Sequence, residues 1–97
     1  MTIYLMAYDL LNESGTHDYE PLWQELKAVE AQSVQDGLWM LEVNRSLSET
    51  VQYFRPLLDG SDRLFITQLR DAEFSQCCSR RGTDDWLELR QPQLLTS

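Results

Sequence analysis

The chain has 97 residues, 42% of them hydrophobic, which is enough for one compact domain with one modest core. Its formal net charge is −8: residues 1–44 carry eight acids and one lysine, and residues 45–97 carry eight acids and seven arginines. This balance argues against a protein that tracks nucleic-acid phosphates, because such a surface needs clustered Lys and Arg. A domain this small gains stability by burying a further apolar face against an identical subunit, so we expect a homodimer.

The first apolar run, IYLMAY at residues 3–8, predicts a buried strand. It is too short to span a bilayer and lacks the basic flank and cleavage site of a signal peptide, so we expect a cytoplasmic protein without a membrane partner. After the turn signal NESG, helical spacing of apolar residues predicts an amphipathic helix over residues 18–31. Pro21 suits its first turn and Asp18 is a plausible cap.

The middle of the chain continues with a strand and a second helix. Residues 38–44, LWMLEVN, alternate between two faces as a strand does. Ser46 followed by Glu49 forms a capping-box pattern at the start of the next helix. Pro56 is expected to kink or shorten that helix.

A third firm strand is predicted at residues 63–69, RLFITQL, and a hairpin partner at residues 32–37. The resulting order is that of an α+β, ferredoxin-like βαββαβ domain, with an antiparallel sheet and two helices on one face. The other face of such a sheet needs a cover, which a second subunit would supply.

We divide the chain into a ferredoxin-like domain, residues 1–70, and a C-terminal extension, residues 71–97. Cys77 and Cys78 are adjacent, which is poor geometry for a disulfide, so we expect both to be reduced. Residues 86–95, WLELRQPQLL, have enough apolar alternation for an extra strand or an extended arm, and the alternative is a disordered tail.

The stretches YLMAYDL, VQDGLWMLEV and RPLLDGSDRLFITQL, with a helix before each of the last two strands, resemble the Cas2-like superfamily. This group comprises the CRISPR-associated protein Cas2, the virulence-associated protein VapD and the SinR-like proteins. The resemblance covers residues 3–69 and is closest to the SinR-like branch. It implies the ferredoxin-like fold and a homodimer.

The resemblance gives Asp9 a role, because Tyr8-Asp9 matches a YD dipeptide at the end of the first strand of the Cas2 group. There the aspartate faces its dimer mate and can hold a divalent cation, Mg²⁺ or Mn²⁺. Such a cation would relieve the repulsion between two carboxylates and could activate water for phosphodiester cleavage. The alternative is that Asp9 only ends the strand and caps backbone N–H groups.

The chain departs from Cas2 around the second strand, where Cas2 carries an arginine and a serine. Ser33 and Gly37 stand at those positions, and Asp36 adds a carboxylate that would repel a nucleic-acid backbone. These departures argue against an adaptor that binds duplexes.

Other candidate site residues each have a plain alternative. His17, the only histidine, follows Asp9 closely enough in sequence to suggest a general acid or base, but loop histidines are commonly just solvated. Candidate phosphate contacts, or simply solvated charges, are Arg55, Arg63, Arg70, Arg80 and Arg81. Core or dimer-interface positions are expected at Tyr8 and Trp39, and analogy with the C-terminal strand of Cas2 relatives adds Trp86, Leu87 and Leu89.

Three functions fit the sequence, and we favour the first. It is a homodimeric interaction module that binds another protein in a defence or toxin-antitoxin-type system, without chemistry of its own. The second is a metal-dependent endonuclease, acting on RNA rather than DNA, with paired Asp9 carboxylates at the dimer axis. The third is an acidic mimic of nucleic acid that occupies a basic groove on its partner.

Overall fold

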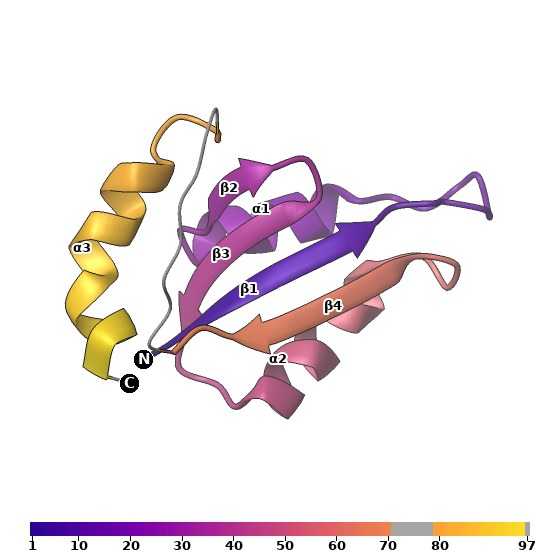
Figure 1. The fold of residues 1–97 in the computed structure, drawn as a ribbon. Coiled ribbons are helices and arrows are strands. Elements are labelled where there is room, and N and C mark those ends of the chain that lie inside the picture. Colours follow the sequence, from indigo (N-terminus) through magenta and orange to yellow (C-terminus); the bar gives the residue numbers. More distant parts are fainter. Residues whose placement is uncertain (71–78, 97) are drawn as a thin grey trace.

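The computed structural model describes residues 1–70 and 79–96, with residues 91–96 described by their backbone alone (Figure 1). The elements in chain order are β1 (Thr2–Asp9), α1 (Glu20–Ala28), β2 (Gln32–Gln35), β3 (Leu38–Val43), α2 (Leu47–Phe54), the 3₁₀ turn η1 (Arg55–Leu57), β4 (Arg63–Gln68) and α3 (Thr83–Thr96). The strands form one four-stranded sheet in the order β2-β3-β1-β4, and every neighbouring pair is antiparallel. The chain is therefore an α+β protein, as predicted.

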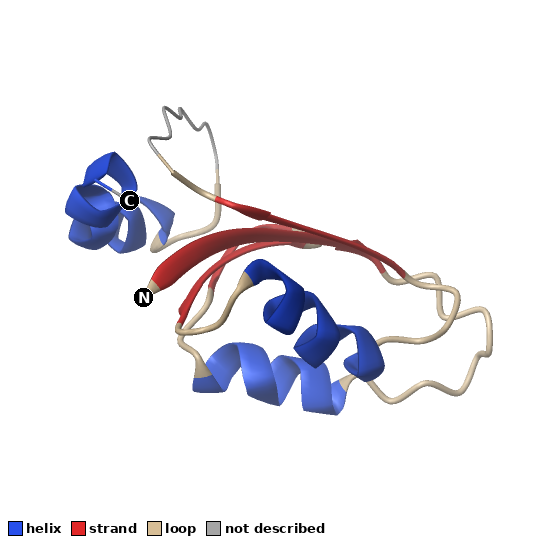
Figure 2. Ribbon diagram, turned by 90° about the horizontal axis from the view of Figure 1, so that it is seen from below, coloured by secondary structure: helices blue, strands red, loops and turns tan. Residues whose placement is uncertain are grey.

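Helices α1 and α2 lie side by side on one face of the sheet (Figure 2). Alternate residues of the strands point into this layer, because successive side chains of a strand face opposite ways. The main core consists of Tyr4, Met6, Leu22, Leu26, Leu41, Val43, Phe54 and Leu58. The predicted alternation of residues 38–44 is confirmed, since Leu41 and Val43 belong to this core and Trp39 packs against it, whereas Met40 belongs to the cluster on the other face.

The capping box and the two prolines of the predicted helices are confirmed, whereas the N-cap of α1 is Tyr19 and not Asp18, whose carboxylate accepts a hydrogen bond from the Glu20 N–H. Ser46 accepts a hydrogen bond from the Glu49 N–H, and the Glu49 carboxylate accepts one from the Ser46 N–H, which completes the capping box. Helix α2 stops at Phe54, and Pro56 lies in the 3₁₀ turn that follows. Pro21 lies in the first turn of α1.

The turn between β2 and β3 depends on Gly37. Its φ is +72°, and a Cβ placed there would lie 2.6 Å from the Tyr8 carbonyl oxygen. The Gly37 carbonyl accepts a hydrogen bond from the Tyr8 N–H at 2.8 Å. A side chain is therefore excluded on two grounds, left-handed backbone and close approach to β1.

The predicted C-terminal strand or arm at residues 86–95 is wrong, because this segment belongs to helix α3. Asp84 and Asp85 in its first turn suit the positive end of the helix dipole. Trp86 and Leu87 are neighbours in sequence but both pack on Ile3 and Met40, which no strand could achieve with adjacent side chains on one face. Packing on the sheet stabilises this segment as a helix. The pattern of apolar residues within 86–95 could not reveal that packing.

Helix α3 lies on the opposite side of the sheet from α1 and α2, at the end where β1 begins (Figures 1 and 2). The Trp86 indole N–H donates to the Glu30 carbonyl oxygen at 3.2 Å. The Arg90 guanidinium stacks on the Trp86 ring at 3.9 Å and lies 3.5 Å from the Glu42 carboxylate. The helix therefore covers one part of this sheet face, and among the described residues the part around Phe65 stays exposed.

Two sequence predictions have a limited counterpart in the structure. Cys77 and Cys78 lie outside the described residues. Within residues 1–70 and 79–96, no helix is both long enough and apolar enough to cross a membrane.

Candidate functional site

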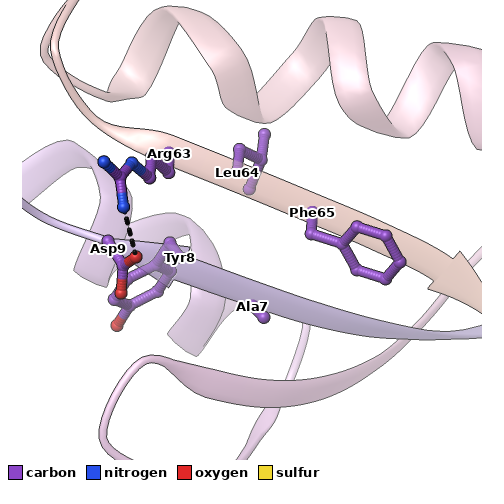
Figure 3. A pocket seen from close by; sticks show the side chains of 6 residues that line it. All are labelled: Ala7, Tyr8, Asp9, Arg63, Leu64 and Phe65. Carbon is purple, nitrogen blue, oxygen red and sulfur yellow. Dashed lines mark ion pairs between the residues drawn. The ribbon is translucent and has the colours of Figure 1, made fainter.

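Asp9 ends β1 directly opposite Arg63, the first residue of β4. The Arg63 Nη1 and Asp9 Oδ2 atoms are 3.7 Å apart, and both side chains are largely exposed, Asp9 at 63% and Arg63 at 76% (Figure 3). An exposed ion pair at this distance contributes at most about 1 kcal/mol to stability. Asp9 is thus accessible and only loosely held.

A shallow pocket of about 160 Å³ surrounds this pair, lined by Ala7, Tyr8, Asp9, Arg63, Leu64 and Phe65. Phe65 projects from β4 beside the small side chain of Ala7 (Figure 3). Its ring is 65% exposed, although it lies in the middle of a strand. The pocket therefore belongs to the uncovered part of the sheet face and combines an apolar surface with one acid and one base.

Within one chain, this pocket does not fit a divalent metal. Asp9 supplies its only carboxylate, and the nearest charged group is the Arg63 guanidinium. Across the residues that the structure describes, no group of three or more His, Cys, Asp and Glu side chains could hold a metal ion. A cation here would need a carboxylate from a second copy of the chain.

His17 contacts other groups than Asp9. Its Nε2 donates to the Leu57 carbonyl oxygen at 2.8 Å, and its ring lies 4.6 Å from the ring of Tyr19. Its backbone N–H donates to Asn12. These contacts fix the loop after β1 against the turn after α2, which is a structural role.

Tyr8 and Trp39, predicted as core or dimer-interface residues, both lie on the side of the sheet that α1 and α2 cover. The Trp39 indole N–H donates to the Tyr8 hydroxyl at 2.8 Å, and the Tyr8 ring lies 6.1 Å from that of Trp23. Burial raises the pKa of the Tyr8 hydroxyl, and the hydrogen bond from Trp39 partly offsets this. Within one chain these two residues pack at the edge of the main core.

The C-terminal interface candidates are divided between the core and the surface. Trp86 and Leu87 are buried against the chain's own sheet, whereas Leu89 is 80% exposed on α3. Only Leu89 of the three is free to contact another molecule without rearrangement.

The candidate phosphate contacts differ in their neighbours within the chain. Arg55 donates to the carbonyl oxygens of Asp59 and Gly60, and Arg80 pairs with the Asp36 carboxylate. Arg63 faces Asp9, as described above. Arg70, just after β4, and Arg81, just before α3, are both exposed. Three of the five are therefore next to acidic or carbonyl groups within the chain.

A buried carboxylate that the sequence analysis missed holds the loops at this end of the molecule. Asp62 accepts hydrogen bonds from the N–H groups of Leu11 (2.7 Å), Asn12 (3.0 Å) and Asp59 (2.8 Å) and from the Tyr19 hydroxyl (2.6 Å). Burial alone would raise its pKa, but these hydrogen bonds outweigh burial and lower the pKa below its usual value. Asp62 ends the turn sequence DGSD at residues 59–62, but Leu11, Asn12 and Tyr19 lie 43 to 51 residues away in sequence and leave no local pattern.

The Tyr19 hydroxyl is expected to lose its proton at an unusually high pH because of this carboxylate. Partial burial, its hydrogen bond to Asp62 and the negative charges of Asp62 and Asp59 raise its pKa to about 12. In the unfolded chain the pKa returns to about 10, so Tyr19 stabilises the fold fully below pH 10 and loses this contribution as the pH rises toward 12. Phenolate absorbance of the wild type minus that of Tyr19→Phe should show a transition near pH 12. A difference transition near pH 10 would contradict the hydrogen bond.

No protein-family model matches this sequence.

Proposed function

We propose that this chain is a ferredoxin-like member of the Cas2-like superfamily, closest to the SinR-like branch. It acts in the cytoplasm as a homodimeric interaction module of a defence or toxin-antitoxin-type system, without chemistry of its own. The observation that carries this proposal is the uncovered part of the sheet face, from which Phe65 projects with 65% of its surface exposed. Aromatic side chains such as Phe are enriched at protein–protein interfaces, and here the ring lies beside a pocket that also holds an acid and a base.

The topology supports the fold part of the proposal. The order of elements from β1 to β4, the antiparallel sheet order β2-β3-β1-β4 and the placement of α1 and α2 on one face are compatible with a ferredoxin-like domain. Helix α3 replaces the C-terminal strand that the relatives carry. Association through an exchanged strand is therefore not available to this segment as folded, and association through the open sheet face is.

The electrostatics support a module without nuclease chemistry. Asp9 already faces a cation, Arg63, and a cationic neighbour competes with a metal for the same carboxylate. Arg80 is paired with Asp36, the carboxylate that stands in the segment where Cas2 relatives carry polar residues for phosphate. A nucleic-acid backbone would meet alternating charges here instead of a basic surface.

The metal-dependent endonuclease remains a second candidate because the Asp9 carboxylate is exposed. Two copies with their open faces together would bring a second carboxylate into reach, which one chain lacks. Mg²⁺ or Mn²⁺ would be the cofactor in this alternative, and RNA the preferred substrate.

Incubation with labelled single-stranded RNA and double-stranded DNA, with and without Mg²⁺ or Mn²⁺, distinguishes the two candidates. We expect no cleavage by the wild type above that of Asp9→Ala, since Arg63 and not a metal faces Asp9. Glu13→Ala serves as the matched control, because Glu13 is an exposed acid on the loop that follows β1. Metal-dependent cleavage that is lost in Asp9→Ala and kept in Glu13→Ala would contradict the interaction module and support the endonuclease.

A further inference from the structure

The uncovered part of the sheet face has a definite shape. On this side of the sheet, Leu5 of β1 packs against the cluster that contains Trp86 and Leu87 of α3. The residues of β1 and β4 beyond that contact are Ala7, Asp9, Arg63 and Phe65. Helix α3 packs on Ile3, at the far end of β1, and leaves the end near Asp9 open (Figure 2). Phe65 is therefore a projecting ring that residues 1–70 and 79–90 leave 65% exposed.

The register between β1 and β4 pairs unlike residues at each level of this surface. Ala7 lies opposite Phe65, so that a small side chain stands beside a large one. One step further, Asp9 lies opposite Arg63, so that an acid stands beside a base. Each of these two levels therefore holds two complementary side chains. At one level the Phe65 ring lies beside the hollow over the small Ala7 side chain, and at the other the Asp9 carboxylate lies beside the Arg63 guanidinium.

This arrangement is self-complementary about one particular symmetry axis. A two-fold axis parallel to the strands, running between β1 and β4 above the open face, places each β1 over the β4 of the other copy. Positions along the strands are unchanged by this rotation, so Phe65 comes over Ala7 of the second copy and Arg63 over its Asp9. Aligned sheets pack face to face at about 10 Å with a crossing angle near 30°.

We propose that two copies of this chain associate face to face about this axis, with each Phe65 ring in the hollow at the other copy's Ala7. Reciprocal ion pairs join each Asp9 to the other copy's Arg63. This inference rests on the proposed homodimer and specifies its interface. It makes Asp9 an interfacial ion-pair residue whose partner is a guanidinium, in place of a metal ligand that faces its own mate.

The second copy is favoured over an unrelated protein because the surface matches itself in two independent properties, shape and charge. An isologous interface requires that each feature meets its complement on the same patch. The ring, the hollow, the acid and the base all satisfy this requirement with one axis. The loose 3.7 Å separation between Arg63 and Asp9 within one chain leaves both groups able to turn toward a second copy.

Sedimentation velocity on charge-exchange variants tests the interface. Asp9→Arg gives a chain with two bases at this edge, and Arg63→Asp gives a chain with two acids. Each variant alone should be monomeric, because like charges meet across the axis. An equimolar mixture should recover the dimer, because unlike charges then meet between chains while the pair within each chain stays repulsive.

A matched control uses the exposed pair Asp36 and Arg80, which lies beside β2 and away from the proposed axis. Asp36→Arg and Arg80→Asp should both remain dimeric, alone and mixed. Phe65→Ala should raise the dissociation constant by about 30-fold, the size typical of a buried aromatic anchor. Phe65 is 65% exposed in one chain, so its removal should leave the fold intact, and circular dichroism checks this.

The outcomes separate this inference from the proposed function. Recovery of the dimer only in the mixture supports the interface. A wild type that is dimeric, with all variants equally dimeric or with a mixture that stays monomeric, overturns the interface and leaves the homodimer standing. A wild type that is monomeric at every concentration overturns both.

Discussion

Replacement of Asp62 by alanine is expected to lower the free energy of unfolding by about 3 kcal/mol, because four hydrogen bonds to a buried carboxylate are lost together. Three of the donors are backbone N–H groups of the loops before α1 and after η1, and they would be left without this acceptor. Urea denaturation followed by circular dichroism measures the change. Both loops should also lose protection against amide hydrogen exchange.

Glu13→Ala is the control for Asp62, since it removes an exposed acid from the same loop region. Its free energy of unfolding should stay within about 0.5 kcal/mol of the wild type. An Asp62→Ala variant that matches Glu13→Ala would contradict the network.

The same carboxylate gives the fold an acid-sensitive component. The pKa of Asp62 is lowered in the folded state, so its stabilising contribution is complete above the unfolded pKa of about 3.9. It is lost as the pH falls through the lower folded value. Stability of the wild type should therefore decrease more steeply below about pH 4 than stability of Asp62→Ala, as measured by thermal unfolding at several pH values.

Replacement of Trp86 by alanine is expected to cost about 3 kcal/mol, the lower part of the range for a buried tryptophan. The variant loses the packing on Ile3 and Met40, the hydrogen bond to the Glu30 carbonyl and the stacked Arg90 guanidinium. Hydrogen exchange should show the amides of α3 losing protection before those of β1 and β3. Chemical denaturation gives the change in free energy.

Leu89→Ala is the control for Trp86, because Leu89 lies on the same helix and is 80% exposed. It should change the stability by less than about 0.5 kcal/mol. Equal effects of the two substitutions would mean that α3 does not dock on the sheet through Trp86.

The sequence predicted the elements whose signals are local. The capping box at Ser46 and Glu49, the prolines near helix ends and the alternation in LWMLEV all report on residues within one turn or one strand, and the structure confirms them. Helix α3 was mistaken for a strand because Trp86 and Leu87 are defined by contacts with β1 and β3, more than 40 residues earlier. Adjacent apolar residues alone do not distinguish a helix that packs on a sheet from a strand.

The candidate site was predicted in part. Asp9 was selected through the resemblance of Tyr8-Asp9 to the Cas2 group, and in the structure it is an accessible carboxylate on the open sheet face. Its neighbours Arg63 and Phe65 could not be derived from sequence, because they depend on the register between β1 and β4. His17, close to Asp9 in sequence, is instead bound to Leu57, since the loop turns toward η1.

The mass of the wild-type protein in solution tests the central claim most directly. Sedimentation velocity over a range of concentrations should give a species of about twice the chain mass of 11.4 kDa, as a homodimer that covers the Phe65 surface requires. A single species of 11.4 kDa at every concentration would contradict the homodimeric module and leave Phe65 to be covered by a different protein.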